Sequence, residues 1–409
     1  MTTARTAPAP ERPATFRDVF AVAEFRALFA GFGIFLIGET VKMLALSVLV
    51  YERTGSGLIA ALAYVTGFLP YAVGGVFLLA LADRWPPRAL MVGYDLLRLA
   101  LVVVLAAGVL PPAGMLGLVF VVGLFGPVSS AARTALLPEI LHGDAYVLGR
   151  SLFTVLSGGT QVVGFAVGGL LLGLVGPYGA LWLTAVTCAI SALLIRLGLR
   201  RRPRRDRGSA GPVRETWRGN RELLADRRVR GLLLAQWLPG SMLVGAEAVA
   251  VPYAAELGPG ASAGVLLMAG AFGMLLGDLV VGRFVAPAAR ERLGPWLALL
   301  LGVPMLVFLL RPGLAVAAVL FGVAAAGFAY QLGLARRFLD AVPPTRRGQA
   351  FGLVSTGLMA TQGLAAAGAG ALSELTGPAV AMAAAGVASL ACTLLLWRVL
   401  KAGKEPPGR

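Results

Sequence analysis

The chain has 409 residues, of which 58% are hydrophobic, and its mean hydropathy of +0.81 excludes an ordinary soluble globule. A net charge of +16 would favour nucleic-acid binding in a soluble protein. Here the cations lie in gaps between apolar stretches, so membrane topology and contact with anionic lipid explain them better. Both cysteines lie inside apolar stretches and there is one histidine, which excludes a disulfide framework and a zinc site and leaves no cofactor to expect.

The N-terminal residues 1–14, rich in Ala, Thr and Pro, predict a disordered cytoplasmic tail. Thr15 and Asp18 then have the spacing of a capping box that opens the first helix. Beyond them, twelve apolar segments are each long enough to cross a hydrocarbon core, which takes about 20 residues. These segments are residues 27–51, 58–81, 89–110, 114–137, 151–174, 178–197, 231–254, 263–285, 295–310, 314–335, 350–372 and 379–396.

The longest polar interval, residues 200–228, divides the segments into two sets of six. Its density of Arg, Pro, Gly and Ser predicts a cytoplasmic linker, and its second part, from Val213 to Arg228, could form an amphipathic surface helix. The predicted domains are an N-terminal bundle over 15–199, a C-terminal bundle over 229–400 and a cytoplasmic tail over 401–409.

The positive charges alternate from one gap to the next. Nearly all of the 36 Lys and Arg residues lie at the two ends of the chain or in every second gap, whereas the other gaps hold only Arg53 and Arg311. This is the positive-inside pattern of a protein that crosses the cytoplasmic (inner) membrane many times, with both termini in the cytoplasm.

The two halves of the chain match each other at an offset of 201 residues. Gln161 then corresponds to Gln362, and the turn Gly176-Pro177 corresponds to Gly377-Pro378. Two repeated six-helix halves are typical of a transporter that alternates access to a central site. We therefore predict an all-α membrane protein with 12 transmembrane helices in two pseudo-symmetric six-helix bundles.

A charged motif lies between the second and third segments and continues into the third. It reads Leu81-Ala82-Asp83-Arg84, then Pro87-Arg88, then Asp95-Leu96-Leu97-Arg98. Three further motifs accompany it: Glu24-Phe25-Arg26, Arg133 with Leu137-Pro138-Glu139, and Arg346-Arg347-Gly348. Together they resemble the major facilitator superfamily, and most closely its branch of macrolide and siderophore (enterobactin-type) exporters, from about Phe16 to Leu400.

The sequence departs from this pattern in two places. Leu79 and Pro86 stand where the family usually has Gly, and Gly164-Phe165 stands where its drug antiporters have Gly-Pro. The second departure weakens the inference of antiport. The resemblance implies the major facilitator fold.

The resemblance also implies a charge network near the cytoplasmic surface that latches the two halves in the outward-open state. Its members are Asp83, Arg84, Arg88, Asp95, Arg98, Arg133 and Glu139. Several such ion pairs would bias a two-state equilibrium by a few kcal/mol. A purely structural role in topology and loop packing is the alternative. Asp278 and Arg283, in the cytoplasmic half of the eighth segment, are expected to form an inner-gate salt bridge.

Acidic residues inside apolar segments are candidates for proton coupling, because a charge at mid-bilayer costs about 2.5–3.5 kcal/mol. Glu39 lies near the middle of the first segment, and Lys42 lies on the same helix face. Either Glu39 binds and releases a proton with Lys42 as charge partner or substrate contact, or the two form a neutralising pair that holds helices together. Glu247, in a seventh segment that Pro239 and Pro252 are expected to break, is a second protonation site or an outer-gate residue.

Polar groups at mid-helix positions are candidates for the wall of a substrate cavity. Gln161 and Gln362 correspond by the repeat and could bond a substrate or hold helices together. Gln236, Tyr330 and Gln331 are further candidates. The cavity is expected to be mostly apolar with few polar anchors, as drug-like ligands require.

No phosphate-binding loop of the G-x-x-x-x-G-K-[ST] type occurs, so ATP is not expected as the energy source. A proton moving down the membrane potential releases about 2.3 kcal/mol per 100 mV, which supports roughly a fifty-fold concentration ratio. We predict a secondary transporter that exports a small amphipathic compound (a drug, siderophore or other secondary metabolite) in exchange for protons. The export direction rests on the resemblance alone.

The expected partners are that substrate, protons and membrane lipid, without nucleic acid, and a monomer is expected. Two alternatives remain open: uptake of a small nutrient by facilitated diffusion or proton symport, and a non-transporting membrane sensor or scaffold. An enzyme is not expected, because the sequence offers no His, Cys or paired-carboxylate constellation for catalysis.

Overall fold

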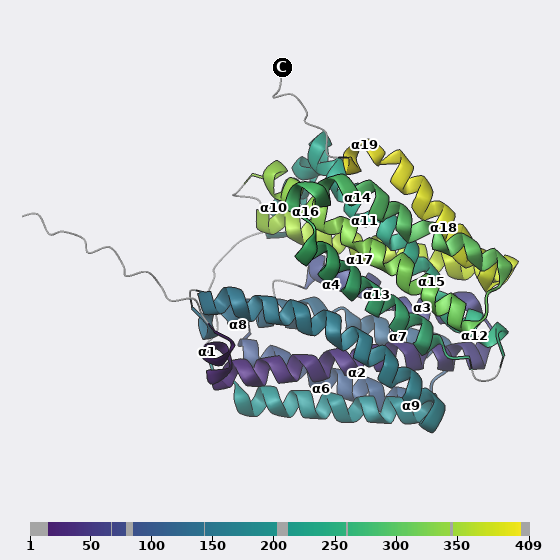
Figure 1. Cartoon of the computed structure of the whole chain (residues 1–409). Coiled ribbons are helices and arrows are strands. Elements are labelled where there is room, and N and C mark those ends of the chain that lie inside the picture. Colours follow the sequence, from purple (N-terminus) through teal and green to yellow (C-terminus); the bar gives the residue numbers. More distant parts are fainter. Residues whose placement is uncertain are drawn as a thin grey trace, which may run out of the picture.

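The structure, a computed structural model, describes residues 15–401 apart from residue 67 and residues 79–84, 143, 203–211, 259–260 and 344–346. The described residues form helices and turns and contain no strand. Figure 1 shows two groups of helices, with the first half of the chain (purple to teal) beside the second half (green to yellow).

The N-terminal bundle begins at the capping box of Thr15 and Asp18, which is formed as predicted. Its helices are α1 (Phe16–Ala21), α2 (Ala23–Thr54), α3 (Gly57–Val65), α4 (Phe68–Phe77), α6 (Pro87–Ala106), α7 (Pro112–Gly123), α8 (Gly126–Ile140) and α9 (Asp144–Gly198). Helix α9 consists of two arms that meet at Gly176, whose backbone is not helical. In the linker, α10 (Pro212–Ala225) confirms that the second part is helical.

The C-terminal bundle repeats this pattern with more interruptions. Its helices are α11 (Arg227–Ala248), α12 (Ala250–Glu256), α13 (Ala263–Phe284), α14 (Pro287–Gly302), the 3-10 helix η1 (Pro304–Leu310), α15 (Leu314–Ala326), the 3-10 helix η2 (Gly327–Ala329), α16 (Tyr330–Ala341), α17 (Arg347–Thr376), α18 (Pro378–Leu395) and α19 (Trp397–Leu400). The predicted break of the seventh segment is present, because α11 and α12 meet at Val249 with a bend of 41°.

The turns support the internal repeat. Every described residue with positive φ has a counterpart in the other half: Gly55 with Gly258, Gly108 with Arg311, and Gly176 with Gly377. Each residue ends a helix in the left-handed backbone region that glycine tolerates best. Gly176 and Gly377 are both followed by proline, which starts the next helix without losing a needed N–H group.

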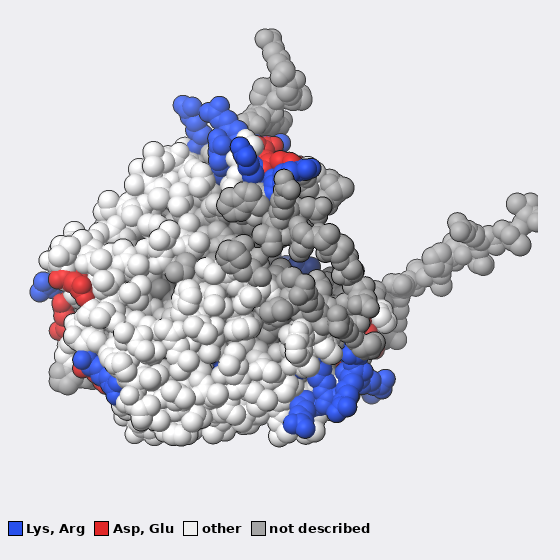
Figure 2. Space-filling view, turned by 180° about the vertical axis from the view of Figure 1, so that it is seen from behind, with Lys and Arg blue, Asp and Glu red and all other residues white. Residues whose placement is uncertain are grey.

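The long apolar helices lie at the positions where the sequence predicts membrane-spanning segments. The number of twelve spans stays a prediction. By length and composition, nine helices of the described chain could cross a membrane, or ten if α11 and α12 form one bent span. The two arms of α9 count once there, and α3 and α4 are each short, with residue 67 undescribed between them. Figure 2 shows the matching surface: a broad face without charged side chains separates ends where charged side chains gather.

Small residues allow helices of the C-terminal bundle to approach closely. A Cβ atom on Gly273 would lie 2.0 Å from the carbonyl oxygen of Gly322, and one on Gly277 would lie 2.4 Å from that of Ala326. Helices α13 and α15 are therefore in backbone contact. Such packing, rather than the hydrophobic effect, holds helices together inside a membrane.

The two bundles meet through α3 with α17 and through α9 with α13. Their backbones touch near one end of the molecule: a Cβ atom on Gly264 would lie 2.6 Å from the Cα of Gly169, and one on Gly370 would lie 2.9 Å from the Cα of Leu58. At the same end, Glu374 accepts hydrogen bonds from the Ser56 hydroxyl and the Leu58 N–H. This closed end lies opposite the arginine-rich ends of the helices, and we call it the outer end.

Candidate functional site

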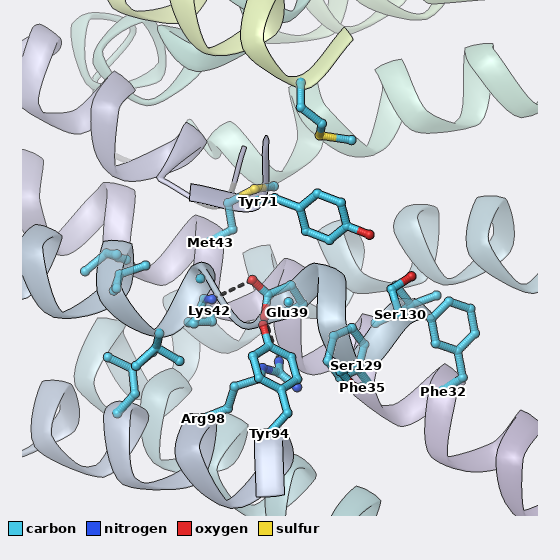
Figure 3. A pocket seen from close by; sticks show the side chains of 18 of the residues that line it. Phe32, Phe35, Glu39, Lys42, Met43, Tyr71, Tyr94, Arg98, Ser129 and Ser130 are labelled. Carbon is cyan, nitrogen blue, oxygen red and sulfur yellow. Dashed lines mark hydrogen bonds and ion pairs between the residues drawn. The ribbon is translucent and has the colours of Figure 1, made fainter. Parts of the chain in front are cut away.

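The N-terminal bundle contains a cavity of about 510 Å³ that opens between its helices (Figure 3). Helices α2, α3, α4, α6, α7, α8 and α9 supply the lining, and α17 of the other bundle adds Met359. The polar lining residues are Glu39, Lys42, Tyr64, Tyr71, Tyr94, Arg98, Ser129, Ser130, Arg133 and Ser157. Most of the remaining lining is aliphatic or aromatic, as expected for an amphipathic ligand.

Glu39 is held by two cations. Lys42 Nζ lies 2.5 Å from one carboxylate oxygen, and Arg98 Nη2 lies 2.7 Å from the other (Figure 3). The first contact follows from the spacing of three residues on α2, which puts both side chains on one helix face. The second joins α2 to α6. An ion pair inside a membrane protein is stable only when its charges compensate each other in this way.

Arg98 and Asp95 lie in the interior of the bundle, so the expectation of a place near the cytoplasmic surface is wrong for both. Arg98 is 1% exposed, its guanidinium lies 4.0 Å from the centre of the Phe35 ring, and Nη1 lies 3.6 Å from Asp95 Oδ1. Asp95 accepts a hydrogen bond of 2.7 Å from Ser191. The physical reason is helix rise: α6 begins at Pro87, so Arg98 lies about three turns into the helix, beside Glu39.

Arg133 lines the same cavity from α8. It projects from α8 into the cavity, with its guanidinium carbon 4.1 Å from the centre of the Phe32 ring and 5.2 Å from that of Phe35. No hydrogen bond or ion pair joins Arg133 to another described residue. The resemblance thus selected a residue of the cavity wall, and its part in a cytoplasmic latch stays a prediction.

The remaining members of the predicted charge network are divided. Asp83 and Arg84 lie outside the described residues, and Arg88, in the first turn of α6, has no ion pair within the described chain. Glu139 pairs with Arg202 Nε at 3.2 Å, and the same arginine reaches Glu24 at 2.6 Å. This network ties the ends of α2, α8 and α9 together within one bundle.

The sequence did not identify Arg202, because nothing local distinguishes it among the many arginines of the linker.

The expected salt bridge between Asp278 and Arg283 is wrong. Both side chains are exposed on α13, and neither has an ion pair among the described residues. Residues five apart on a helix face different directions, whereas pairing needs a spacing of three or four. Arg283 instead lies 5.9 Å from the Phe284 ring centre.

Glu247 lies at the contact between the bundles. Its carboxyl group shares a hydrogen bond with the hydroxyl of Tyr64, which belongs to α3 of the other bundle. A Cβ atom on Gly270 of α13 would lie 3.9 Å from the Oε1 atom of Glu247. No cation forms an ion pair with Glu247 in the described part of the chain. Tyr64 was missed in the sequence because its partner is far away along the chain.

The neutral polar candidates do not line the cavity around Glu39. Gln161 and Gln362 are half-buried on α9 and α17, and Gln236 bonds the Leu232 carbonyl of its own helix at 3.4 Å. Tyr330 is a core residue, so its expected place in the cavity wall is wrong: it is 0% exposed and donates to the Ala235 carbonyl at 3.0 Å. Gln331 bonds the Tyr330 hydroxyl.

The polar wall that replaces these residues consists of Tyr71, Tyr94 and three serines. A signal for them existed in the sequence, because Tyr94 directly precedes Asp95, and Ser129 and Ser130 lie one turn before Arg133. The neighbours of Asp95 in α6 and of Arg133 in α8 were thus better indicators of the cavity wall than the glutamines matched by the repeat.

Comparisons with known proteins identify the family. The Major Facilitator Superfamily model matches residues 28–336. Macrolide efflux protein A of Streptococcus pyogenes is 30% identical over 124 residues, which make up 28% of this chain and 31% of that protein. The chain therefore matches less than a third of this curated relative's length.

Three solved structures share the fold at low identity. They are the POT family transporter PepTSo (TM-score 0.70, 10% identity, 95% of this chain and 98% of that one), a mutant of the nucleoside transporter NupG (0.70, 14%, 93% and 100%), and a bacterial homologue of the human lysosomal transporter Spinster, inward-facing and unoccupied (0.67, 16%, 94% and 96%). The family match, the repeated bundles and the long apolar helices together lead to one conclusion: the chain belongs to the major facilitator superfamily and is a multi-pass membrane transporter rather than an enzyme.

Proposed function

We propose that this transporter exports a small amphipathic compound in exchange for protons, by alternating access of its two bundles. The observation that carries the coupling is Glu247, a carboxyl group between the bundles whose hydrogen-bond partner, Tyr64, belongs to the opposite bundle. Export is supported by the similarity to macrolide efflux protein A. The apolar cavity beside Glu39 supports an amphipathic substrate.

Glu39 and Glu247 differ in what compensates their charge. Lys42 and Arg98 neutralise Glu39 within the N-terminal bundle, so this compensation persists when the bundles move. Glu247 is hydrogen-bonded to the phenol of Tyr64 and forms no ion pair with a cation among the described residues. A carboxylate that is kept from water without a cation costs several kcal/mol, so contact between the bundles favours the protonated form of Glu247.

The proton cycle follows from this difference. Opening of the outer end would separate Glu247 from Tyr64 and admit water, which stabilises the carboxylate. Uptake of a proton from outside would then favour closure of the outer end, and release of that proton toward the cytoplasm would accompany substrate binding. Glu39 is the second candidate for a proton, because a substrate that displaced Lys42 or Arg98 would uncover its carboxylate.

We further propose that the protein lies in the cytoplasmic membrane with both termini in the cytoplasm. The arginine-rich ends of α2, α8 and α9 would then face the anionic inner leaflet. In this orientation the loop motif of Asp83, Arg84 and Arg88 keeps its proposed role as part of a cytoplasmic latch. The ion pairs of Arg202 with Glu24 and Glu139 lie within the N-terminal bundle, so these pairs do not latch the two bundles together.

Substrate-driven proton movement in proteoliposomes tests the coupling. The assay combines an enclosed pH-sensitive dye with the compound of a drug and siderophore panel that the wild-type protein transports. Glu247→Gln keeps the shape of the side chain and a hydrogen bond to Tyr64 but cannot titrate. We expect a loss of proton flux of at least tenfold, with retained exchange of labelled for unlabelled substrate.

Glu52→Gln, an exposed glutamate at the outer end of α2, serves as the matched control. Proton flux that persists at the wild-type level in E247Q would refute the assignment to Glu247. Substrate movement without any proton flux in the wild-type protein would refute coupling altogether and favour a facilitator.

A further inference from the structure

Arg133 is the charged side chain of the described cavity wall that forms no ion pair with a described residue. Its guanidinium lies against the rings of Phe32 and Phe35 at 4.1 and 5.2 Å from their centres. The described residues offer it no hydrogen bond and no carboxylate within ion-pair distance. Contact with aromatic rings offsets only part of the cost of an unpaired charge.

The other charges of the cavity are already matched. Lys42 and Arg98 both form ion pairs with Glu39. Asp95 forms an ion pair with Arg98 and accepts a hydrogen bond from the Ser191 hydroxyl. These four charged residues compensate one another, so the cavity as a whole keeps one positive charge, on Arg133. A cationic ligand would find no free carboxylate on the described wall. An anionic ligand would find a guanidinium whose five donors bond no described residue.

The surroundings of Arg133 suit a ligand with an acidic end and an apolar body. Ser129, Ser130 and Ser157 line the cavity together with Arg133, and the Ser157 hydroxyl donates to the Phe153 carbonyl. Phe32, which lies under Arg133, is about two turns of α2 from Glu39. The wall beyond Glu39 is aliphatic, with Met43, Leu46, Leu101, Val119 and Val122.

We infer that Arg133 determines substrate specificity by binding a carboxylate of the transported compound, and that the substrates are amphipathic acids. This inference deepens the proposed function and rests on it. The planar guanidinium binds a carboxylate through two parallel hydrogen bonds, which fix orientation as well as charge. The carboxylate then lies beside the serine hydroxyls, and the apolar body extends along α2 past Glu39.

Equilibrium binding with three compounds of one shape tests the inference. The probes are 2-naphthylacetate, 2-naphthylacetamide and 2-(2-naphthyl)ethylammonium, titrated into the full-length protein in detergent by isothermal calorimetry, with empty micelles as the blank. We expect the carboxylate to bind at least tenfold more tightly than the amide and the ammonium. Tenfold corresponds to about 1.4 kcal/mol, within the range for a hydrogen bond to a charged group.

Substitutions assign the preference to Arg133. Arg133→Gln should lower affinity for the carboxylate at least tenfold and leave affinity for the amide unchanged, while Arg133→Lys, which keeps the charge without the planar fork, should lose part of the preference. Arg227→Gln, at the exposed start of α11, is the matched surface control. Size-exclusion chromatography checks the fold of each variant.

The inference is overturned if the carboxylate binds no better than the other two compounds, if it gives no measurable binding, or if R133Q and R133K both keep the full preference. No proton gradient is present in this experiment. A negative result therefore leaves proton coupling through Glu247 intact, and failure of the E247Q flux test leaves carboxylate recognition intact.

Discussion

The two bundles repeat each other in backbone but differ in charge. By the spacing of the paired turns, Arg98 of the N-terminal bundle corresponds to Leu301 of the C-terminal bundle, and Asp95 corresponds to Ala298. Both C-terminal counterparts are 0% exposed core residues. The same spacing matches Glu39 with Met242 and Lys42 with Gly245.

This difference separates two tasks that a transporter must perform. The N-terminal bundle concentrates charges that compensate one another around a cavity, which suits it to hold a ligand. The C-terminal bundle is apolar at the corresponding positions and carries Glu247, which faces the other bundle and lacks a cation among the described residues. Under the proposed function, ligand binding and the response to protons thus lie on opposite sides of the contact between the bundles.

The largest expected effect comes from making the N-terminal bundle resemble its counterpart. Arg98→Leu leaves Glu39 and Asp95 with one cation between them, and breaking a buried ion pair from one side costs about 3–5 kcal/mol. We expect a clear fall in the thermal unfolding midpoint of the purified protein. The double variant Asp95→Ala/Arg98→Leu, which copies Ala298 and Leu301, should recover part of the loss. An R98L protein as stable as the wild type would contradict this assignment.

A smaller effect tests the repeat itself. Gly176→Ala and Gly377→Ala should each cost about 1–2 kcal/mol, because both residues have positive φ and alanine is strained there. Space is not the cause, since an added Cβ atom meets nothing within 4 Å at Gly176 and only Glu256 at 3.7 Å at Gly377.

Gly173→Ala, within the regular part of α9, is the control for this pair and should cost nothing or stabilise slightly. Chemical unfolding of the three variants in detergent gives the comparison. Strongly unequal losses at Gly176 and Gly377 would argue against equivalent turns in the two halves.

The smallest effect concerns the closed outer end. Glu374→Gln weakens the contacts with the Ser56 hydroxyl and the Leu58 N–H, and exposed interactions of this kind shift an equilibrium by a factor of about two to five. Spin labels at Glu52→Cys and Thr376→Cys report the distance across the outer end, with Cys188 and Cys392 replaced. We expect a modest increase in the population with the longer distance between the labels. An unchanged distance distribution would show that Glu374 does not help to close the outer end.

Local patterns in the sequence predicted much of the fold. Hydrophobic length located the helical segments, and the turn at Gly176-Pro177 revealed the repeat. The prolines of the seventh segment predicted a break, which lies near Pro252, whereas α11 continues through Pro239. Each of these features depends on neighbouring residues. The pair of Glu39 and Lys42 was found for the same reason, because a spacing of three on a helix is local information.

The candidate site was only partly predictable because its key contacts join distant parts of the chain. Glu39 meets Arg98 across 59 residues, and Glu247 meets Tyr64 across the two bundles. Motif resemblance selected Arg98 and Arg133 but carried no information on how deep each residue lies in the bundle. Depth follows from the helix start at Pro87, which the structure provides.

The most direct test of the account is the pH dependence of the outer end. Distances between the labels at residues 52 and 376, measured by double electron–electron resonance, should be short at acidic pH, where Glu247 is protonated and bonded to Tyr64, and should lengthen as the pH rises. The E247Q variant should show a distance distribution that does not change with pH. A wild-type distance distribution that ignores pH, or an E247Q distribution that shifts as the wild type does, would contradict the claim that the proton on Glu247 controls contact between the bundles.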